Sequence, residues 1–297
     1  MIMTKSLKLH IADSLDGRKA ESVLEKELLL SRSLIGKLKR IEGAVLLDGK
    51  EIRLTDRVYE GSEIEVKLPC GRNEDISAVN IPLQILYEDD FIIAVNKPFG
   101  MPSHPSRVHR EDTLLNALKF HLGYTGHIIT RLDKDTTGAV LVAKDPHAAA
   151  IMTEQMKKRK IYKEYIAFTD GIPKLTSGRI TAPIIKTKNS MKRVVSEDGQ
   201  DAVTEYEVLG TDGKNSVVKL VPITGRTHQL RVHMNYIGCP IYGDSLYGKA
   251  QTEGLFLHCR NIKFLHPVTD EYISIVAPTD GKWDEMCCKE GIYDAEL

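Results

Sequence analysis

Residues 127–145, HIITRLDKDTTGAVLVAKD, are the stretch around which the rest of the chain is organised. Apolar residues lie before a polar turn, and an unbroken apolar run, VLV at 140–142, lies after it. This pattern predicts a strand, a turn and a buried strand, with Gly138 able to supply a positive φ. In an extended segment the side chains of Arg131 and Asp133 share one face. A carboxylate beside a guanidinium stays ionised even when partly buried, as a nucleophile or base must.

A lone Arg-Leu-Asp tripeptide is also common as a structural ion pair at a strand end. The whole string RLDKDTTG at 131–138, however, resembles the catalytic motif of the RluA family of RNA pseudouridine synthases, usually HRLDxxTSG. Thr130 stands where that family usually has His, and Thr137 where it usually has Ser. The Arg-Leu-Asp core is unchanged, and the resemblance implies that Asp133 is the essential carboxylate.

Length and composition place the chain among globular proteins. Its 297 residues are 42% hydrophobic, enough for one large domain and a small one. No apolar run reaches about 18 residues and the start lacks the apolar region of a signal peptide, so we expect a cytoplasmic protein without a membrane span. Five scattered cysteines without C-x-x-C spacing favour a reducing compartment and argue against a zinc site. The 41 basic and 41 acidic residues balance, so local patches would have to hold any nucleic acid.

Residues 1–70 are expected to form a small domain of their own. The pattern at 20–40 predicts two short helices with a break near 31–33, residues 43–50 predict a hairpin with a tight Asp-Gly turn, and 62–68 a final strand. SRS and GAVLLDGK in these segments resemble the ribosomal-protein-type RNA-binding domain that carries the alpha-L motif. The resemblance implies phosphate contacts from cations of the second helix, although an ordinary solvated helix face has the same pattern. These cations are Arg32, Lys37, Lys39 and Arg40.

Residues 71–80 are polar and short, and are interpreted as a linker. The catalytic domain would then cover residues 81–297. It opens with two predicted strands around an acidic turn at 88–90, followed by a loop rich in Pro and Gly. That loop contains NKPFGMPSHP at 96–105, another string that resembles the RluA family.

A helix and a strand are predicted directly after the central stretch. Asp145 followed by Pro146 predicts a capped helix running to about Lys160. The alternation that follows predicts a strand on which Lys163 and Tyr165 share a face. A tyrosine in such a strand is commonly a core residue with a satisfied hydroxyl. Here K-x-Y-x-A resembles the family's second motif, which implies that Tyr165 stacks on the target uracil and accepts or relays the proton leaving carbon 5.

The string TGRTHQLRVH at 224–233 resembles the family's third motif. Thr227 is expected to cap a helix, and a glycine–arginine turn at a helix start is a natural anion site. The resemblance implies that Arg231 pairs with Asp133 and keeps it ionised. The strand LFLHC at 255–259 resembles the family's L-H-A strand, with Cys in place of Ala. The substrate-binding residues implied by the resemblance are Arg131, which would fill the space left by a flipped uridine, Leu257, Lys163, Arg226 and His228.

Residues 181–206 predict a strand, a basic loop and a second strand. A loop with several cations and few acids could close over an RNA backbone, and it could equally be a solvated hairpin. Its candidate RNA contacts are Lys188, Lys192 and Arg193.

Three other functions fit single features of the chain. Residues 243–249 have the spacing of a P-loop, but Ala250 stands where magnesium binding needs Ser or Thr. Asp135 beside Asp133 would suit a hydrolase, but in a Thr-Thr-Gly turn it is better explained as a turn residue. A non-catalytic RNA-binding or ribosome-assembly factor on the same scaffold should lack one of the catalytic residues, and all are present.

We therefore expect an α+β RNA pseudouridine synthase of the RluA type. Its catalytic domain would surround a mixed, largely antiparallel bent sheet with flanking helices, with a small α/β RNA-binding domain at the N-terminus. Large-subunit ribosomal RNA is the expected partner and transfer RNA the alternative; no metal, organic cofactor or obligate protein partner is expected. The sequence leaves open whether the carboxylate attacks the ribose, adds to the ring or removes a ribose proton. The expected catalytic residues are Asp133, Tyr165 and Arg231.

Overall fold

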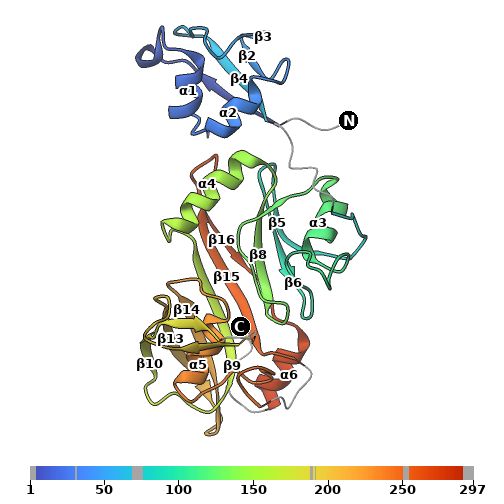
Figure 1. Ribbon diagram of the computed structural model, residues 1–297, viewed down its shortest axis with the longest axis vertical. Helices are drawn as coiled ribbons and strands as arrows, with labels where there is room; N and C mark the ends of the chain where they lie inside the picture. Colours follow the sequence, from blue (N-terminus) through green and yellow to red (C-terminus); the bar gives the residue numbers. More distant parts are fainter. Residues whose placement is uncertain are drawn as a thin grey trace.

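The chain forms an N-terminal unit and a larger C-terminal unit, and its two largest hydrophobic cores lie one in each (Figure 1). No helix in the described part is long and apolar enough to cross a membrane. The domain boundary predicted near residue 70 falls within 69–75, outside the described residues. This computed structural model describes residues 5–30, 32–68, 76–187, 190, 192–249 and 254–289.

The N-terminal unit is a four-stranded antiparallel sheet, in the order β1-β4-β2-β3, with two helices packed on it. The predicted hairpin is confirmed: Asp48 and Gly49 have φ of 49° and 77°, as a type I′ turn requires. The first helix ends at Lys26, earlier than the pattern suggested, and strand β1 was not predicted. Its elements are β1 (Lys5–His10), a 3-10 turn (Asp13–Leu15), α1 (Ala20–Lys26), α2 (Arg32–Leu38), β2 (Val45–Leu47), β3 (Lys50–Glu51) and β4 (Glu63–Leu68).

The C-terminal unit is built on a ten-stranded mixed sheet whose main path runs β10-β13-β14-β9-β15-β8-β6-β5. Only β8 and β15 pair in parallel among the described strands, so the expected mixed, largely antiparallel sheet is confirmed. The two-stranded hairpin of β11 and β12 lies outside this sheet.

The elements of the C-terminal unit follow in chain order. They are β5 (Gln84–Glu88), β6 (Ile92–Lys97), α3 (Leu114–Leu122), β7 (His127–Ile128), β8 (Thr137–Ala143), α4 (Pro146–Lys157), β9 (Tyr162–Asp170), β10 (Ser177–Thr181), β11 (Ile184–Lys186), β12 (Arg193–Val195), β13 (Val203–Thr211), β14 (Asn215–Pro222), α5 (Gln229–Tyr236), β15 (Leu257–Leu265), β16 (Tyr272–Val276) and α6 (Gly281–Lys289).

The central stretch forms the predicted strand, turn and strand, but its first strand, β7, is only two residues long. Thr130 follows this strand and is buried. Its hydroxyl accepts a 2.8 Å hydrogen bond from the backbone N–H of Leu141. This bond links the end of the segment after β7 to β8, just before the loop that carries Asp133. The expected alternation persists beyond the strand, since Arg131 is exposed, Leu132 buried and Asp133 half-buried.

The two helix starts differ in how well the sequence predicted them. Asp145 caps α4 as expected, accepting from two backbone N–H groups, and the helix ends at Lys157. Thr227 does not cap α5, which begins at Gln229. The Gln229 side-chain oxygen instead accepts from the hydroxyl of Thr224 and the backbone N–H of Arg226 at 2.7 and 3.0 Å, and so closes the turn itself.

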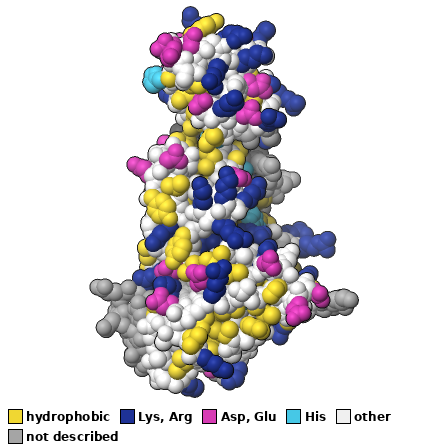
Figure 2. Space-filling model, turned by 90° about the vertical axis from the view of Figure 1, so that its left-hand side faces the viewer, with side chains coloured by type: hydrophobic (Ala, Val, Ile, Leu, Met, Phe, Trp, Pro, Cys, Tyr) yellow, Lys and Arg dark blue, Asp and Glu magenta, His cyan; other side chains and the backbone are white. Residues whose placement is uncertain are grey.

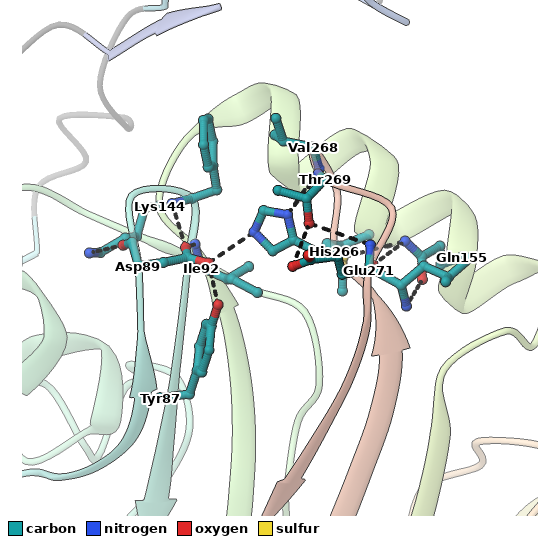
Figure 3. Close-up of polar contacts among 12 residues, drawn as sticks. Tyr87, Asp89, Ile92, Lys144, Gln155, His266, Val268, Thr269 and Glu271 are labelled. Carbon is teal, nitrogen blue, oxygen red and sulfur yellow. Dashed lines mark hydrogen bonds and ion pairs between the residues drawn. The ribbon is translucent and has the colours of Figure 1, made fainter.

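Two hairpin turns at one end of the sheet are joined through Asp89 and His266 (Figure 3). One oxygen of Asp89 accepts backbone N–H groups of its own turn, and the other accepts from Tyr87 Oη at 2.7 Å and His266 Nε2 at 2.9 Å. His266 Nδ1 accepts the Thr269 N–H at 3.0 Å. Because Nδ1 accepts a backbone N–H, Nε2 is the nitrogen that donates to Asp89.

Gly138 is the point of closest approach between β8 and β15. Its φ is 108°, and a Cβ placed there would lie 2.3 Å from the backbone oxygen of Cys259. Cys259 in turn lies opposite Tyr165 of β9, so this contact positions three strands at once. Only glycine fits both the backbone conformation and the space.

We expect Gly138→Ala to destabilise the fold by roughly 3 kcal/mol or more, because left-handed strain adds to a backbone clash. Gly213→Ala is the matched control: its φ is 89° but nothing lies within 4 Å of its Cβ position, so strain alone should cost about 1–2 kcal/mol. Urea unfolding of both variants measures the difference. Equal losses would contradict the role assigned to the β8–β15 contact.

Candidate active site

All eight residues expected to act in catalysis or substrate binding line one pocket of about 810 Å³. The pocket lies where the catalytic loop after β7, strand β9, the start of α5 and the first residue of β15 meet. Its size is in the range of ordinary ligand sites. The eight residues are Arg131, Asp133, Lys163, Tyr165, Arg226, His228, Arg231 and Leu257.

The pocket is strongly basic although the chain as a whole is balanced. Among the described residues that line it, five are Lys or Arg and one is a carboxylate. One face of the molecule shows Lys and Arg side chains gathered across its middle (Figure 2). Such a pocket attracts a polyanion without help from net charge. The lining cations are Arg131, Lys134, Lys163, Arg226 and Arg231, and the carboxylate is Asp133.

Asp133 presents its carboxylate to the pocket. Its side chain is 34% exposed, and Oδ2 lies 3.8 Å from His228 Nε2 and 3.9 Å from Arg231 Nη1. Both distances are too long for a good hydrogen bond. No described residue lies within hydrogen-bonding distance of the Asp133 side-chain oxygens, so they remain available to a bound substrate.

Arg231 is held by a residue to which the sequence analysis gave no role. Its Nε and Nη2 donate to the two oxygens of Asp244, both at 2.7 Å, and both side chains are buried. Asp244 also accepts backbone N–H groups from Leu246 and Tyr247. Burial opposes ionisation of Asp244, but the guanidinium and these N–H groups outweigh it and lower the carboxyl pKa. The two parallel hydrogen bonds to Asp244 fix the orientation of the Arg231 guanidinium. Its third nitrogen, Nη1, points to Asp133.

His228 and Tyr247 contact each other beside Asp133 and Arg231. His228 has a left-handed backbone with φ of 57°, and its Nδ1 lies 2.9 Å from the Tyr247 hydroxyl. Burial lowers the pKa of His228, and Arg231 lowers it further against the opposing effect of Asp133. The imidazole is therefore neutral at neutral pH. Tyr247, also missed from sequence, accepts the Arg193 backbone N–H and lies against the Arg231 guanidinium, 5.3 Å from its centre.

Tyr165 lines the floor of the pocket with only 7% of its surface exposed. Burial, then the neighbouring Cys259, raises the pKa of its hydroxyl well above the usual value. Tyr165 therefore stays a neutral phenol, able to stack on a base and to exchange hydrogen bonds, and not a phenolate base. Lys163 lies two residues earlier on β9, and burial lowers its pKa.

Residues 91–236 match the family model described as RNA pseudouridylate synthase. A protein named uncharacterized RNA pseudouridine synthase YjbO, from Bacillus subtilis, is 36% identical over 85% of this chain and 92% of its own length. The chain belongs to the RluA family of RNA pseudouridine synthases. Ribosomal large subunit pseudouridine synthase D of Xanthomonas campestris is 34% identical, with 90% of this chain and 87% of that protein covered. The structure of Human RNA Pseudouridylate Synthase Domain Containing 4 matches with a TM-score of 0.61 and 28% identity, over 71% and 94% of the two chains.

A buried lysine, to which the sequence analysis gave no role, supports the loop that carries Asp133 in the pseudouridine synthase. Lys97, at the end of β6, is fully buried, and its ammonium donates to the backbone oxygens of Pro98, Met101 and Lys134 at 2.8–2.9 Å. Lys134 directly follows Asp133 in the chain. Burial lowers the pKa of Lys97 to about 7, although the charges of Asp135 and Asp133 oppose the shift. The sequence pointed to Lys97 only through the NKP string at 96–98, which does not show what the lysine contacts.

The predicted RNA-contact residues of the synthase lie elsewhere. Lys192 and Arg193 are on or beside β12, where one buried guanidinium nitrogen of Arg193 lacks a partner among described residues, while Lys188 lies outside the described residues. The cations of α2 and its end are exposed in the N-terminal unit. Of these, Arg32 pairs with Glu25 at 2.8 Å and Lys39 with Glu21 at 3.2 Å, while Lys37 and Arg40 form no ion pair with a described residue.

We expect Asp244→Asn to lower the rate of pseudouridine formation about 100-fold, because Arg231 loses the partner that orients it toward Asp133. The same change should cost about 3 kcal/mol of stability, since it leaves a buried guanidinium uncompensated. Asp170→Asn, which breaks the surface pair with Lys249 at 3.4 Å, should change neither by much. Rates at saturating RNA together with urea unfolding test this. A folded and fully active Asp244→Asn would refute it.

The stability of the wild type relative to Lys97→Met should rise between pH 7 and about 10. In this window unfolded lysine, with a pKa of 10.5, holds a proton that folded Lys97, with a pKa of about 7, has lost. Because the unfolded state binds the extra proton, a lower proton concentration stabilises the unfolded state less, and the free energy of unfolding rises with pH. Unfolding free energies across the range measure the effect, with exposed Lys214→Met as the control. A difference that stays constant with pH would contradict it.

Proposed function

We propose that the enzyme isomerises specific uridines of large-subunit ribosomal RNA, with Asp133, Tyr165 and Arg231 as its catalytic residues. The observation that carries this proposal is the Asp133 carboxylate, open to a basic pocket with an aromatic floor. The ribosomal target is supported by relatives named for the large subunit, in Xanthomonas campestris and in Xylella fastidiosa, the latter 33% identical over 93% of this chain.

In the reaction the bond between ribose carbon 1′ and uracil N1 breaks, and a bond from carbon 1′ to carbon 5 forms. Carbon 5 then loses a proton and N1 gains one, so the atoms balance without an added reactant. The negatively charged carboxylate of Asp133 initiates this change of the glycosidic bond. Arg231, oriented by Asp244, stabilises that charge throughout. Neutral Tyr165 would stack on the detached uracil and relay the carbon 5 proton.

Uridine must leave its stack before it can reach the pocket. Arg131 is exposed on the catalytic loop beside Asp133 and lines the pocket. Its planar guanidinium can take the place of the displaced base against the neighbouring bases. Leu257 and the buried stem of Lys163 would then hold the uracil ring, and Arg226 and His228 would contact its nucleotide from the other side of the pocket.

The N-terminal unit would serve as an alpha-L-type RNA-binding domain. Its helices bury their apolar residues against the sheet, which leaves the cations of α2 facing water. Lys37 and Arg40 are the strongest phosphate candidates because neither forms an ion pair with a described residue. The basic hairpin of β11 and β12, with Lys192 and Arg193, would add contacts closer to the pocket.

Asp133→Asn is expected to abolish pseudouridine at one or a few positions of large-subunit ribosomal RNA in cells that carry it in place of the wild type. Pseudouridine mapping across total RNA measures this and names the target. Asp135→Asn, in the same loop, is the control and should leave the map unchanged.

Lys37→Glu with Arg40→Glu, in the N-terminal unit, should lower modification at the same positions only partly. An unchanged map in Asp133→Asn cells would refute the catalytic assignment, and losses confined to transfer RNA would replace the target.

A further inference from the structure

His258, the second residue of β15, is buried next to the pocket and uses both of its ring nitrogens. Its Nδ1 lies 2.8 Å from the Thr137 hydroxyl, and its Nε2 lies 3.1 Å from the Ala277 carbonyl oxygen. Burial lowers the pKa of the imidazole to about 4, so the ring is neutral at neutral pH and carries one proton. A carbonyl oxygen can only accept, so this proton is on Nε2 and the Thr137 hydroxyl donates to Nδ1.

Thr137 is the residue at which the loop that carries Asp133 ends and β8 begins. Strand β8 lies between β6 and β15 in the sheet, and a buried side chain from each of these neighbours holds the loop. Lys97 of β6 holds its start, by donating to the Lys134 carbonyl at 2.9 Å. His258 of β15 holds its end, by accepting from the Thr137 hydroxyl. The loop is therefore tied to both sides of β8.

Strand β15 also contributes to the opposite side of the pocket from this loop. Leu257, directly before His258, lines the pocket, and Cys259, directly after it, lies opposite Tyr165 of β9. The parallel pairing of β8 with β15 is short and includes His258 opposite Thr137. A buried side-chain hydrogen bond between the same two residues adds to this pairing and makes the offset between the two strands more rigid.

We propose that His258 is a positioning residue of the reaction. Through the Thr137 hydroxyl it sets the place of the Asp133 carboxylate relative to the floor of the pocket. His258 does not line the pocket, so it acts through Thr137 and not on the substrate. The inference rests on the proposed function, because it takes Asp133 as the reacting carboxylate. A displacement of a reacting group by about 1 Å can cost about 100-fold in rate, and the hydrogen bond prevents such a displacement.

The two hydrogen bonds of His258 have different effects. The bond to Ala277, together with the edge contact between the His258 and Trp283 rings at 6.3 Å, joins β15 to α6 and to the segment before it. Such a bond stabilises the fold, as buried polar pairs generally do. The bond to Thr137 ends on the loop of the reacting carboxylate, so it also affects the geometry of the reaction. Because each bond uses its own ring nitrogen, each can be removed without the other.

Two substitutions of His258 each keep one of its hydrogen bonds. The amide oxygen of His258→Asn can accept near the place of Nδ1, whereas the amide nitrogen of His258→Gln can donate near the place of Nε2. The substrate is total RNA from cells that lack the enzyme, and pseudouridine formation is followed at the positions that the wild type modifies. His258→Gln should lower kcat about 10- to 100-fold at unchanged KM, while His258→Asn should keep most of the rate.

Substitutions of Thr137 test the other end of the same bond. Thr137→Val removes the hydroxyl and should lower kcat as much as His258→Gln does. Thr137→Ser retains the hydroxyl and should keep most of the rate. Thr137→Val combined with His258→Gln should lose no more than either change alone, because both remove one shared interaction.

Thr169→Val is the matched control. The Thr169 hydroxyl is also buried and lies 2.7 Å from Ser216 Oγ, but Thr169 is at the far end of β9 from Tyr165 and does not line the pocket. Its loss should lower the melting temperature about as much as Thr137→Val does, because each change removes one buried hydrogen bond. It should leave kcat unchanged.

Two results would overturn the inference. One is an equal loss of kcat in His258→Asn and His258→Gln that follows their melting temperatures, since this is what a purely structural role predicts. The other is a fully active Thr137→Val. Asp133→Asn, assayed beside them, separates this inference from the proposed function. An inactive Asp133→Asn with fully active Thr137→Val and His258→Gln would overturn the inference alone, whereas an active Asp133→Asn would refute the proposed function on which it rests.

Discussion

The close packing of β15 on Gly138 is the constraint on which the C-terminal unit depends. The backbone of Cys259 occupies the space that a side chain at 138 would need. Through this contact β15 pairs in parallel with β8 on one side and antiparallel with β9 on the other. The loop that carries Asp133 comes directly before β8, and Tyr165 lies on β9. The pocket therefore exists because three strands from distant parts of the sequence meet at one glycine.

Within that frame, burial and pairing determine which groups carry charge. Arg231 is buried but remains compensated by Asp244, and low local polarity strengthens its field at Asp133. His228 and Tyr165 are neutral at neutral pH because burial shifts their pKa values away from the charged forms. The result is an open carboxylate among oriented dipoles and cations, an environment that stabilises developing charge without reorganisation during the reaction.

A balanced chain can still recognise RNA when its charges are segregated. The acidic residues that neutralise the total lie mostly away from the pocket, whose lining holds five cations and one carboxylate among the described residues. Recognition of this kind relies on preorganised local surfaces, so it tolerates a net charge near zero.

The sequence by itself determined the local elements and the membership of the site. Caps, turns and apolar runs depend on near neighbours, so the Asp145 cap, the Asp48–Gly49 turn and the buried β8 run could be predicted. The motif strings also indicated residues that all reach one pocket. The pairings across the chain were decided only by tertiary structure. Asp244 with Arg231, Lys97 with the Lys134 carbonyl and β1 with β4 join segments whose partners no local pattern specifies. The Thr227 cap failed for the same reason: the Gln229 side chain competes for the turn, and its place depends on how α5 packs against β13.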